Sequence, residues 1–202
     1  MPPNWDEDSP RLRGNLTALL QEMAASAKAR EKLSCEVLRS WHKRIMRGLG
    51  VPEKHFVGAF RGEPGLETIG VRIGRSYGVA PSEVADALRR FEEKLATLVA
   101  ELDAHLPPGI EPDGDQLSAI LDLCAWVHAE WVRIHPFANG NGRIARLLAN
   151  CLAMRYGLPP FIRLRPRPDG GYGEAGVRAM QGDWRSTAIV FRALLDDFLM
   201  QH

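Results

Sequence analysis

One short stretch, His135–Arg146, constrains the fold of this chain more than any other. Apolar residues at helical spacing lead into it and a second such pattern leaves it, so the stretch joins two helices that are expected to be buried. The first pattern comprises Leu117, Ile120, Leu121, Cys124, Val127 and Trp131, and the second Ile144, Leu147, Leu148, Cys151 and Leu152. Between them, the glycines of Asn139-Gly-Asn-Gly142 can take positive φ and bring backbone N–H groups close to a ligand.

The same stretch predicts an anion site. The turn opens onto a helix N-terminus, where N–H groups and the helix dipole favour negative charge. Arg143 and Arg146 are three residues apart and share a face of the first turn, which suits a polyphosphate. His135 enters the loop and could accept a proton beside bound phosphate. Each feature alone also suits an ordinary connector, an exposed histidine or a solvated helix face, and it is their compact order that favours the anion site.

The segment HPFANGNGRIAR resembles the signature of the Fic (filamentation induced by cAMP) family, His-Pro-Phe-x-(Asp/Glu)-Gly-Asn-Gly-Arg-x-x-Arg. Only the acidic position differs, because the chain has Asn139 there. The resemblance covers roughly residues 50–200. It implies an all-α fold, a Fic-type helical bundle with one small β-hairpin, the flap, beside the active site. Residues 1–50 would be an N-terminal helical extension carrying an inhibitory helix, and residues 51–202 the Fic domain.

The resemblance also implies a protein AMP-transferase that moves AMP from ATP to a hydroxyl side chain of a target protein, with Mg²⁺. His135 would be the catalytic residue that takes the proton of the attacking hydroxyl. The nucleotide and its phosphates would be bound by Gly140, Asn141, Gly142, Arg143, Arg146 and Tyr172. For Tyr172, a residue packed on the bundle at a helix start is the alternative to a residue of the adenine pocket.

Asn139 stands where the family has the carboxylate that holds Mg²⁺. An amide oxygen can bind Mg²⁺ but is neutral, whereas Mg²⁺ sites usually include one or two carboxylates. We therefore expect a weaker metal site at Asn139 and an active enzyme, since a pure binding module would have no need of His135. A non-catalytic nucleotide- or protein-binding module is one alternative, and an enzyme that transfers UMP, phosphocholine or phosphate is another. The sequence does not identify the target protein, and it leaves oligomerisation open.

Two further segments suggest roles beside the motif. The β-favouring runs Phe56–Phe60 and Glu67–Ile73 flank Arg61–Gly65 and predict the hairpin. Its exposed edge would hold the target as an added strand, through residues Phe60, Arg61, Thr68, Ile69 and Val71. The alternative is a hairpin that only caps the bundle.

The segment Ser9-Pro-Arg-Leu-Arg13-Gly14 resembles the family's inhibitory motif, (Ser/Thr)-x-x-x-Glu-(Gly/Asn). In relatives the glutamate pairs with the second motif arginine, here Arg146. Arg13 replaces that glutamate, and two cations repel. The lock is therefore lost or has been removed, or else Ser9 is simply the N-cap of a helix that begins at Pro10.

Further helices are expected after Ser34 and over residues 82–105, 115–134, 172–181 and 184–200. On them, the run Arg89–Lys94 is expected to be solvated and His128 to be packed rather than bound to metal. The three cysteines are odd in number and lie in apolar patterns, so we expect reduced thiols in a cytoplasmic protein, with a secreted effector as the alternative. A net charge of +1 and the lack of a long apolar run predict neither nucleic-acid nor membrane binding.

Overall fold

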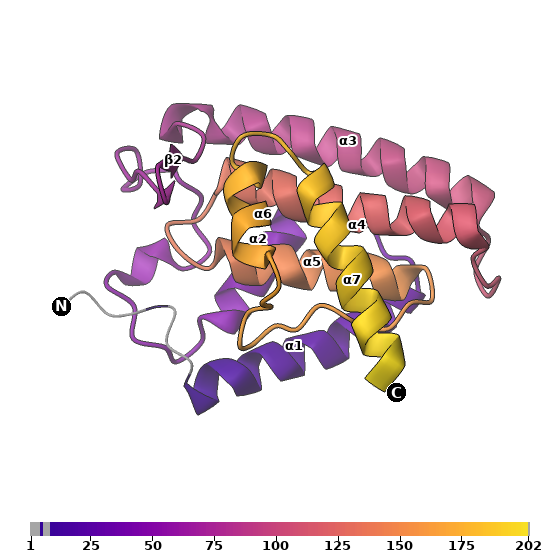
Figure 1. Ribbon diagram of the computed structural model, residues 1–202. Helices are drawn as coiled ribbons and strands as arrows, with labels where there is room; N and C mark the ends of the chain where they lie inside the picture. Colours follow the sequence, from indigo (N-terminus) through magenta and orange to yellow (C-terminus); the bar gives the residue numbers. More distant parts are fainter. Residues whose placement is uncertain (1–4, 6–8, 202) are drawn as a thin grey trace.

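The computed structural model describes residue 5 and residues 9–201, which form a helical bundle with one small hairpin (Figure 1). The prediction of a helical bundle with a single hairpin is thereby confirmed. The helices are α1 (Pro10–Lys28), α2 (Cys35–Ile45), α3 (Val84–His105), α4 (Gly114–Ile134), α5 (Asn141–Arg155), α6 (Tyr172–Ala179) and α7 (Arg185–Gln201). Two 3₁₀ turns, η1 (Lys54–Phe56) and η2 (Pro81–Glu83), and the strands β1 (Arg72–Ile73) and β2 (Ser76–Tyr77) complete the elements.

Helices α4 and α5 form the centre of the bundle. Both bury residues on nearly all sides, including Trp131 at the end of α4 and Leu148 in α5. Helix α3 covers α4 on one side, α1 covers α5 on the other, and α7 crosses α4 (Figure 1). The loop between α4 and α5 is consequently held by the most deeply buried pair of helices in the fold.

Helix starts follow the capping residues that the sequence offers. The Ser9 hydroxyl accepts the backbone N–H of Leu12 at 3.2 Å, and the Ser34 hydroxyl accepts that of Val37 at 3.3 Å. Both bonds satisfy N–H groups that the first helical turn leaves without a partner, which confirms Ser9 as an N-cap and a helix start after Ser34. Asp113 and Gln116 form a capping box at the start of α4.

The hairpin exists, but the predicted pairing of its two runs was wrong, and only Arg72–Ile73 at the end of the second run forms a strand. Arg72 pairs with Tyr77 and Ile73 with Ser76, so the turn lies at Gly74 rather than at Arg61–Gly65. Phe60 instead makes an isolated antiparallel bridge with Phe137 of the α4–α5 loop. We use the name flap for residues 69–79, which comprise the hairpin and its two flanks (Figure 1).

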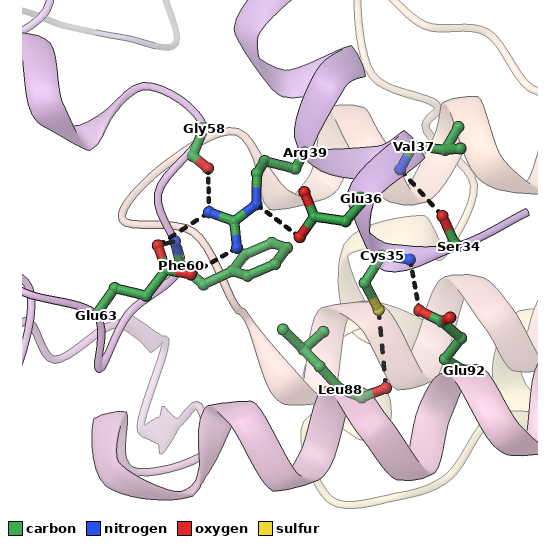
Figure 2. A network of polar contacts seen from close by, with 10 residues as sticks. All are labelled: Ser34, Cys35, Glu36, Val37, Arg39, Gly58, Phe60, Glu63, Leu88 and Glu92. Carbon is green, nitrogen blue, oxygen red and sulfur yellow. Dashed lines mark hydrogen bonds and ion pairs between the residues drawn. The ribbon is translucent and has the colours of Figure 1, made fainter.

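A polar network fixes the segment before the flap, as Figure 2 shows. The Arg39 guanidinium donates to both carboxylate oxygens of Glu63, at 2.9 and 2.5 Å, and to the carbonyl of Gly58 at 2.7 Å. It also lies 4.0 Å from the centre of the Phe60 ring. Because Glu63 in turn accepts the Phe60 N–H at 3.0 Å, this segment is tied to α2 and cannot act as an exposed strand.

Glu92 corrects the prediction of a fully solvated charge run on α3. The Glu92 carboxylate is half-buried and accepts the backbone N–H of Cys35 at 2.8 Å, at the N-terminus of α2 (Figure 2). An anion there complements the helix dipole, so Glu92 anchors α2 to α3. As expected, Cys35, Cys124 and Cys151 are free thiols, the latter two buried. Within the described part of the chain, no helix is both long and apolar enough to span a membrane.

Candidate active site

His135 follows the last residue of α4 and has a left-handed backbone, with φ 53° and ψ 55°. This conformation is uncommon for a residue with a side chain and ends the helix abruptly. The Nδ1 of the half-buried ring lies 2.8 Å from the carbonyl oxygen of Val132. A carbonyl can only accept, so Nδ1 carries the proton and Nε2 is the basic nitrogen of the ring.

The loop after His135 is anchored by Phe137 and Asn141. The Phe137 ring is fully buried beneath the loop. The Asn141 side chain accepts the Phe137 N–H at 2.9 Å and donates to the Phe137 carbonyl at 2.8 Å. The Asn141 side chain therefore holds the loop. The phosphate binding that we predicted for this residue would use its backbone N–H, and it stays a prediction.

His42 of α2 supports the loop from below and was not among the residues predicted from the sequence. Its ring stacks on Phe137 with centroids 3.9 Å apart. Its Nδ1 accepts the Gly58 N–H at 2.9 Å, so Nε2 carries the proton and donates to the Asn139 carbonyl at 3.0 Å. Burial lowers the pKa of His42 to about 3, so the ring is neutral.

Helix α5 begins after a glycine N-cap with a left-handed backbone. Gly140 has φ 84°, and no side chain of the described residues caps this helix. A Cβ at Gly140 would lie 2.7 Å from the Met46 Cε and 3.2 Å from the His42 Nε2, so only glycine fits. The N–H groups of Asn141 and Gly142 stand at this helix start, where an anion would be favoured, and their role in phosphate binding stays a prediction.

Arg143 and Asn139 form a pair across the first turn of α5. Arg143 is buried, and its Nη2 donates to the Asn139 Oδ1 at 2.7 Å. Asn139 thus offers a Mg²⁺ ion one neutral oxygen that already accepts a bond from a cation. Among the described residues, no group of three or more Asp, Glu, His or Cys side chains could hold a metal ion. The site therefore offers Mg²⁺ one weak ligand, the Asn139 Oδ1. The remaining ligands of the ion would be nucleotide phosphates and water.

Arg146 is the second buried cation of the motif, and it belongs to a polar chain inside the bundle. Its guanidinium donates to the Tyr172 hydroxyl at 3.0 Å and to the Leu164 carbonyl at 3.2 Å. The Tyr172 hydroxyl lies 2.7 Å from the Nε2 of His128, whose pKa burial lowers to about 3. His128 is packed, as expected. Tyr172 is buried with its hydroxyl bonded inside the bundle, and its predicted contact with adenine stays a prediction.

The flap lies directly against His135. A Cβ at Gly78 would approach the His135 Cβ to 2.9 Å. Phe60 and Arg61 are only 6% and 2% exposed, so their prediction as part of an exposed docking edge was wrong. Thr68 is exposed, Ile69 and Val71 are half-buried, and their docking role stays a prediction.

The segment that resembles an inhibitory motif forms the N-cap and first turns of α1. Arg13 is exposed on the first turns of α1 and lines a hollow with Leu164, whose carbonyl accepts a bond from Arg146. Gly14 lies within the helix, and Ser9 is its cap. The segment is thus placed near the second motif arginine, and an inhibitory role stays a prediction.

Comparison with known proteins gives the chain a family. The sequence model of the Fic/DOC family matches residues 32–153. The chain is similar to a protein adenylyltransferase, fic-1 of Caenorhabditis briggsae, with 31% identity over 136 residues. These make up 67% of this chain and 22% of that protein. It is also similar to protein adenylyltransferase Fic of Nematostella vectensis, with 38% identity over 96 residues, which are 40% of this chain and 22% of that protein. The chain therefore matches only a minor part of these relatives.

Solved structures share the fold. A Fic domain-containing signalling protein of Bacteroides thetaiotaomicron superposes with a TM-score of 0.65 at 19% identity, covering 92% of this chain and 69% of that one. BepC of Bartonella tribocorum, solved with AMPPNP bound, gives 0.61 at 16% identity, covering 95% and 90%. Fic-1 of Caenorhabditis elegans gives 0.63 at 24% identity, covering 97% and 53%. At these identities the likeness concerns the fold alone.

Proposed function

We propose that this chain, which belongs to the Fic/DOC family, transfers AMP from ATP to a hydroxyl side chain of another protein. Relatives of 31–38% identity that are named protein adenylyltransferases support this proposal. So does the nucleotide analogue bound to BepC, a protein of the same fold. The observation that carries the proposal is the contact of the His135 Nδ1 with the Val132 carbonyl, which leaves Nε2 as the basic nitrogen in the loop that leads into α5.

In this mechanism, the flap pairs with the target and brings its hydroxyl to His135. Nε2 takes the hydroxyl proton as the oxygen attacks the α-phosphorus. The bond between the α-phosphorus and the bridging oxygen breaks, and pyrophosphate leaves with that oxygen and the electron pair. The N–H groups of Asn141 and Gly142 stabilise the charge that develops on the phosphate oxygens. Arg143 and Arg146 place two further cations beside the leaving group.

Mg²⁺ would be held by the Asn139 Oδ1 together with phosphate oxygens, and when bound it supplies neutralising charge. Arg143 competes for the same oxygen from 2.7 Å, so we expect metal affinity to be weak. The neutral Asn139 side chain also favours the second candidate function, a binding module that holds nucleotide without transferring it.

The test is incorporation of radiolabelled ATP into this protein and into a cell lysate, with wild type and His135→Ala compared. Label that enters from α-³²P but not from γ-³²P would support AMP transfer. A decrease of this label by at least about a hundredfold in His135→Ala would support the role of His135. Label from γ-³²P would instead indicate phosphate transfer. ATP binding without either label would support the binding module.

Nucleotide binding separates a catalytic from a structural effect of the substitution. In this mechanism His135 acts on the target hydroxyl and not on the bound phosphates, so His135→Ala is expected to keep ATP affinity within about threefold of wild type. A variant that loses label and ATP binding together would point to a collapsed loop.

A further inference from the structure

Arg61 lies between the flap and the loop that carries His135. Its guanidinium donates four hydrogen bonds, all to backbone carbonyls. Two acceptors belong to the end of α4, namely His135 at 2.7 Å from Nε and Ile134 at 3.0 Å from Nη2. The other two flank the hairpin, namely Val79 at 2.7 Å from Nη2 and Ile69 at 3.2 Å from Nη1. One side chain therefore connects both ends of the flap to the backbone of His135.

The surroundings of Arg61 favour a geometric role over a simple charge pair. Its side chain is almost fully buried, and the described residues provide it with no salt-bridge partner. Burial lowers its pKa to about 10, so the group is still protonated at neutral pH. The negative end of the α4 dipole compensates part of the cost of burying the charge. A planar fork of five N–H donors can reach four carbonyls at once, and an ammonium group cannot.

Two backbone contacts add to this connection. The Arg61 N–H donates to the Pro136 carbonyl at 2.7 Å, so its main chain is also bonded to the loop. Gly78 packs so closely that a Cβ there would lie 2.9 Å from the His135 Cβ and 3.2 Å from the Arg61 Nη2. The flap, Arg61 and His135 thus form one unit in which a shift of any member displaces the others.

We propose that Arg61 is a positioning residue that holds the flap in register with His135, so that a polypeptide paired with the flap presents its hydroxyl to Nε2. This inference rests on the proposed function for its catalytic consequence, but its structural part can be tested alone. Arg61 does not touch the reacting atoms, and it acts through the carbonyls of Ile69, Val79 and His135.

The experiment compares Arg61→Lys with wild type and with Arg90→Lys, a matched exchange of an exposed arginine on α3. Hydrogen exchange is measured at residues 69–79 and, as an internal reference, at residues 117–134 of α4. We expect exchange in the flap to accelerate at least about tenfold in Arg61→Lys, with α4 and the Arg90→Lys protein unchanged. Transfer of α-³²P label to a target should fall about tenfold or more, while ATP affinity stays within about threefold.

Unchanged hydrogen exchange of the flap in Arg61→Lys would overturn the proposal. Equal acceleration of exchange in the flap and in α4 would also overturn it, because Arg61 would then stabilise the whole fold rather than the flap. If the lysine variant does not fold, Arg61→Gln replaces it, because an amide donates hydrogen bonds without burying a charge. A wild-type protein that transfers no AMP would refute the proposed function, while the exchange pattern would still decide the role of Arg61.

Discussion

Backbone carbonyls hold most of the side chains around His135. The His135 ring donates to Val132, the Asn141 amide brackets Phe137, and His42 donates to Asn139. Contacts of this kind fix the orientation of each group through the main chain. The geometry of the site therefore depends on the path of the loop.

Asn139→Asp is expected to increase the Mg²⁺ response of nucleotide binding. A carboxylate at this position would offer a charged ligand in place of a neutral oxygen. It would also form a charge-assisted bond with Arg143, whose Nη2 is already 2.7 Å from the Asn139 Oδ1. We expect the half-saturating Mg²⁺ concentration, measured by calorimetry of ATP binding at stepped Mg²⁺ levels, to fall about tenfold or more.

Asn139→Ala is the matched control for this prediction, because it removes the oxygen altogether. Its ATP affinity should no longer respond to Mg²⁺ beyond the response of free ATP itself. If the wild type and the aspartate variant titrate alike, position 139 is not a metal ligand in this chain.

The motif residues could be predicted from the sequence because their roles depend on neighbours a few positions away. Gly140 and the start of α5 are of this kind. His42 could not be, since it meets Asn139 across 97 positions and lies in an amphipathic helix pattern without distinction. Arg61 was predicted on an exposed docking edge, because nothing local indicates that four backbone carbonyls surround its guanidinium.

The flap is an element with little structure of its own. Its strands contain two residue pairs, Arg72 with Tyr77 and Ile73 with Ser76. A hairpin this short is at best marginally stable alone, so contacts at its base must hold it in place. Those contacts are Arg61 and the close approach of Gly78 to His135.

Gly78→Ala is expected to displace the flap and lower AMP transfer about tenfold while the bundle stays folded. The added methyl would lie 2.9 Å from the His135 Cβ and 3.0 Å from a methyl of Val71, closer than such atoms approach. The measurement is the initial rate of α-³²P labelling, with circular dichroism to verify the fold.

Gly70→Ala is the control within the same element. A Cβ at Gly70 would meet no atom within 4 Å, so this variant should label at the wild-type rate. Equal rates for the two alanine variants would mean that the base of the flap tolerates displacement.

The error in the predicted strands has a physical cause. Phe56–Phe60 has high β propensity, but Phe60 packs on Phe137 and beneath Arg39, and the run does not pair with residues 67–73. Strand propensity measures how well side chains suit a half-buried surface, and here the α4–α5 loop provides that surface.

At the scale of the whole molecule, helix periodicity was sufficient for the fold class. Helices α4 and α5 are buried on nearly all sides and form the centre, and α3 presents one apolar face. Such patterns persist over many residues, so they survive local errors. The site is less predictable because it combines α2, the flap and α6. These elements are far apart in the sequence and come together only in the folded chain.

Two buried histidines make the stability of the whole bundle depend on pH. His42 supports the loop beneath α5, and His128 lies between α4 and α6. Burial lowers the pKa of each to about 3, below the value of about 6.5 in an unfolded chain. Between these values the unfolded state binds more protons than the folded one. The free energy of unfolding therefore falls as pH falls below about 6.5.

Each histidine should remove about 1.4 kcal/mol of stability per pH unit once the pH is well below 6.5. Urea unfolding between pH 7 and 5 would measure this slope, above the range where most carboxylates titrate. Replacing either His42 or His128 by glutamine should remove the contribution of that histidine to the slope. The two rings belong to separate hydrogen-bond networks, so the double variant should lose both contributions. A slope that survives in the double variant would show that other groups control acid sensitivity. If the His42→Gln variant alone lost the whole slope, His128 would have to titrate in the folded bundle as it does in the unfolded chain.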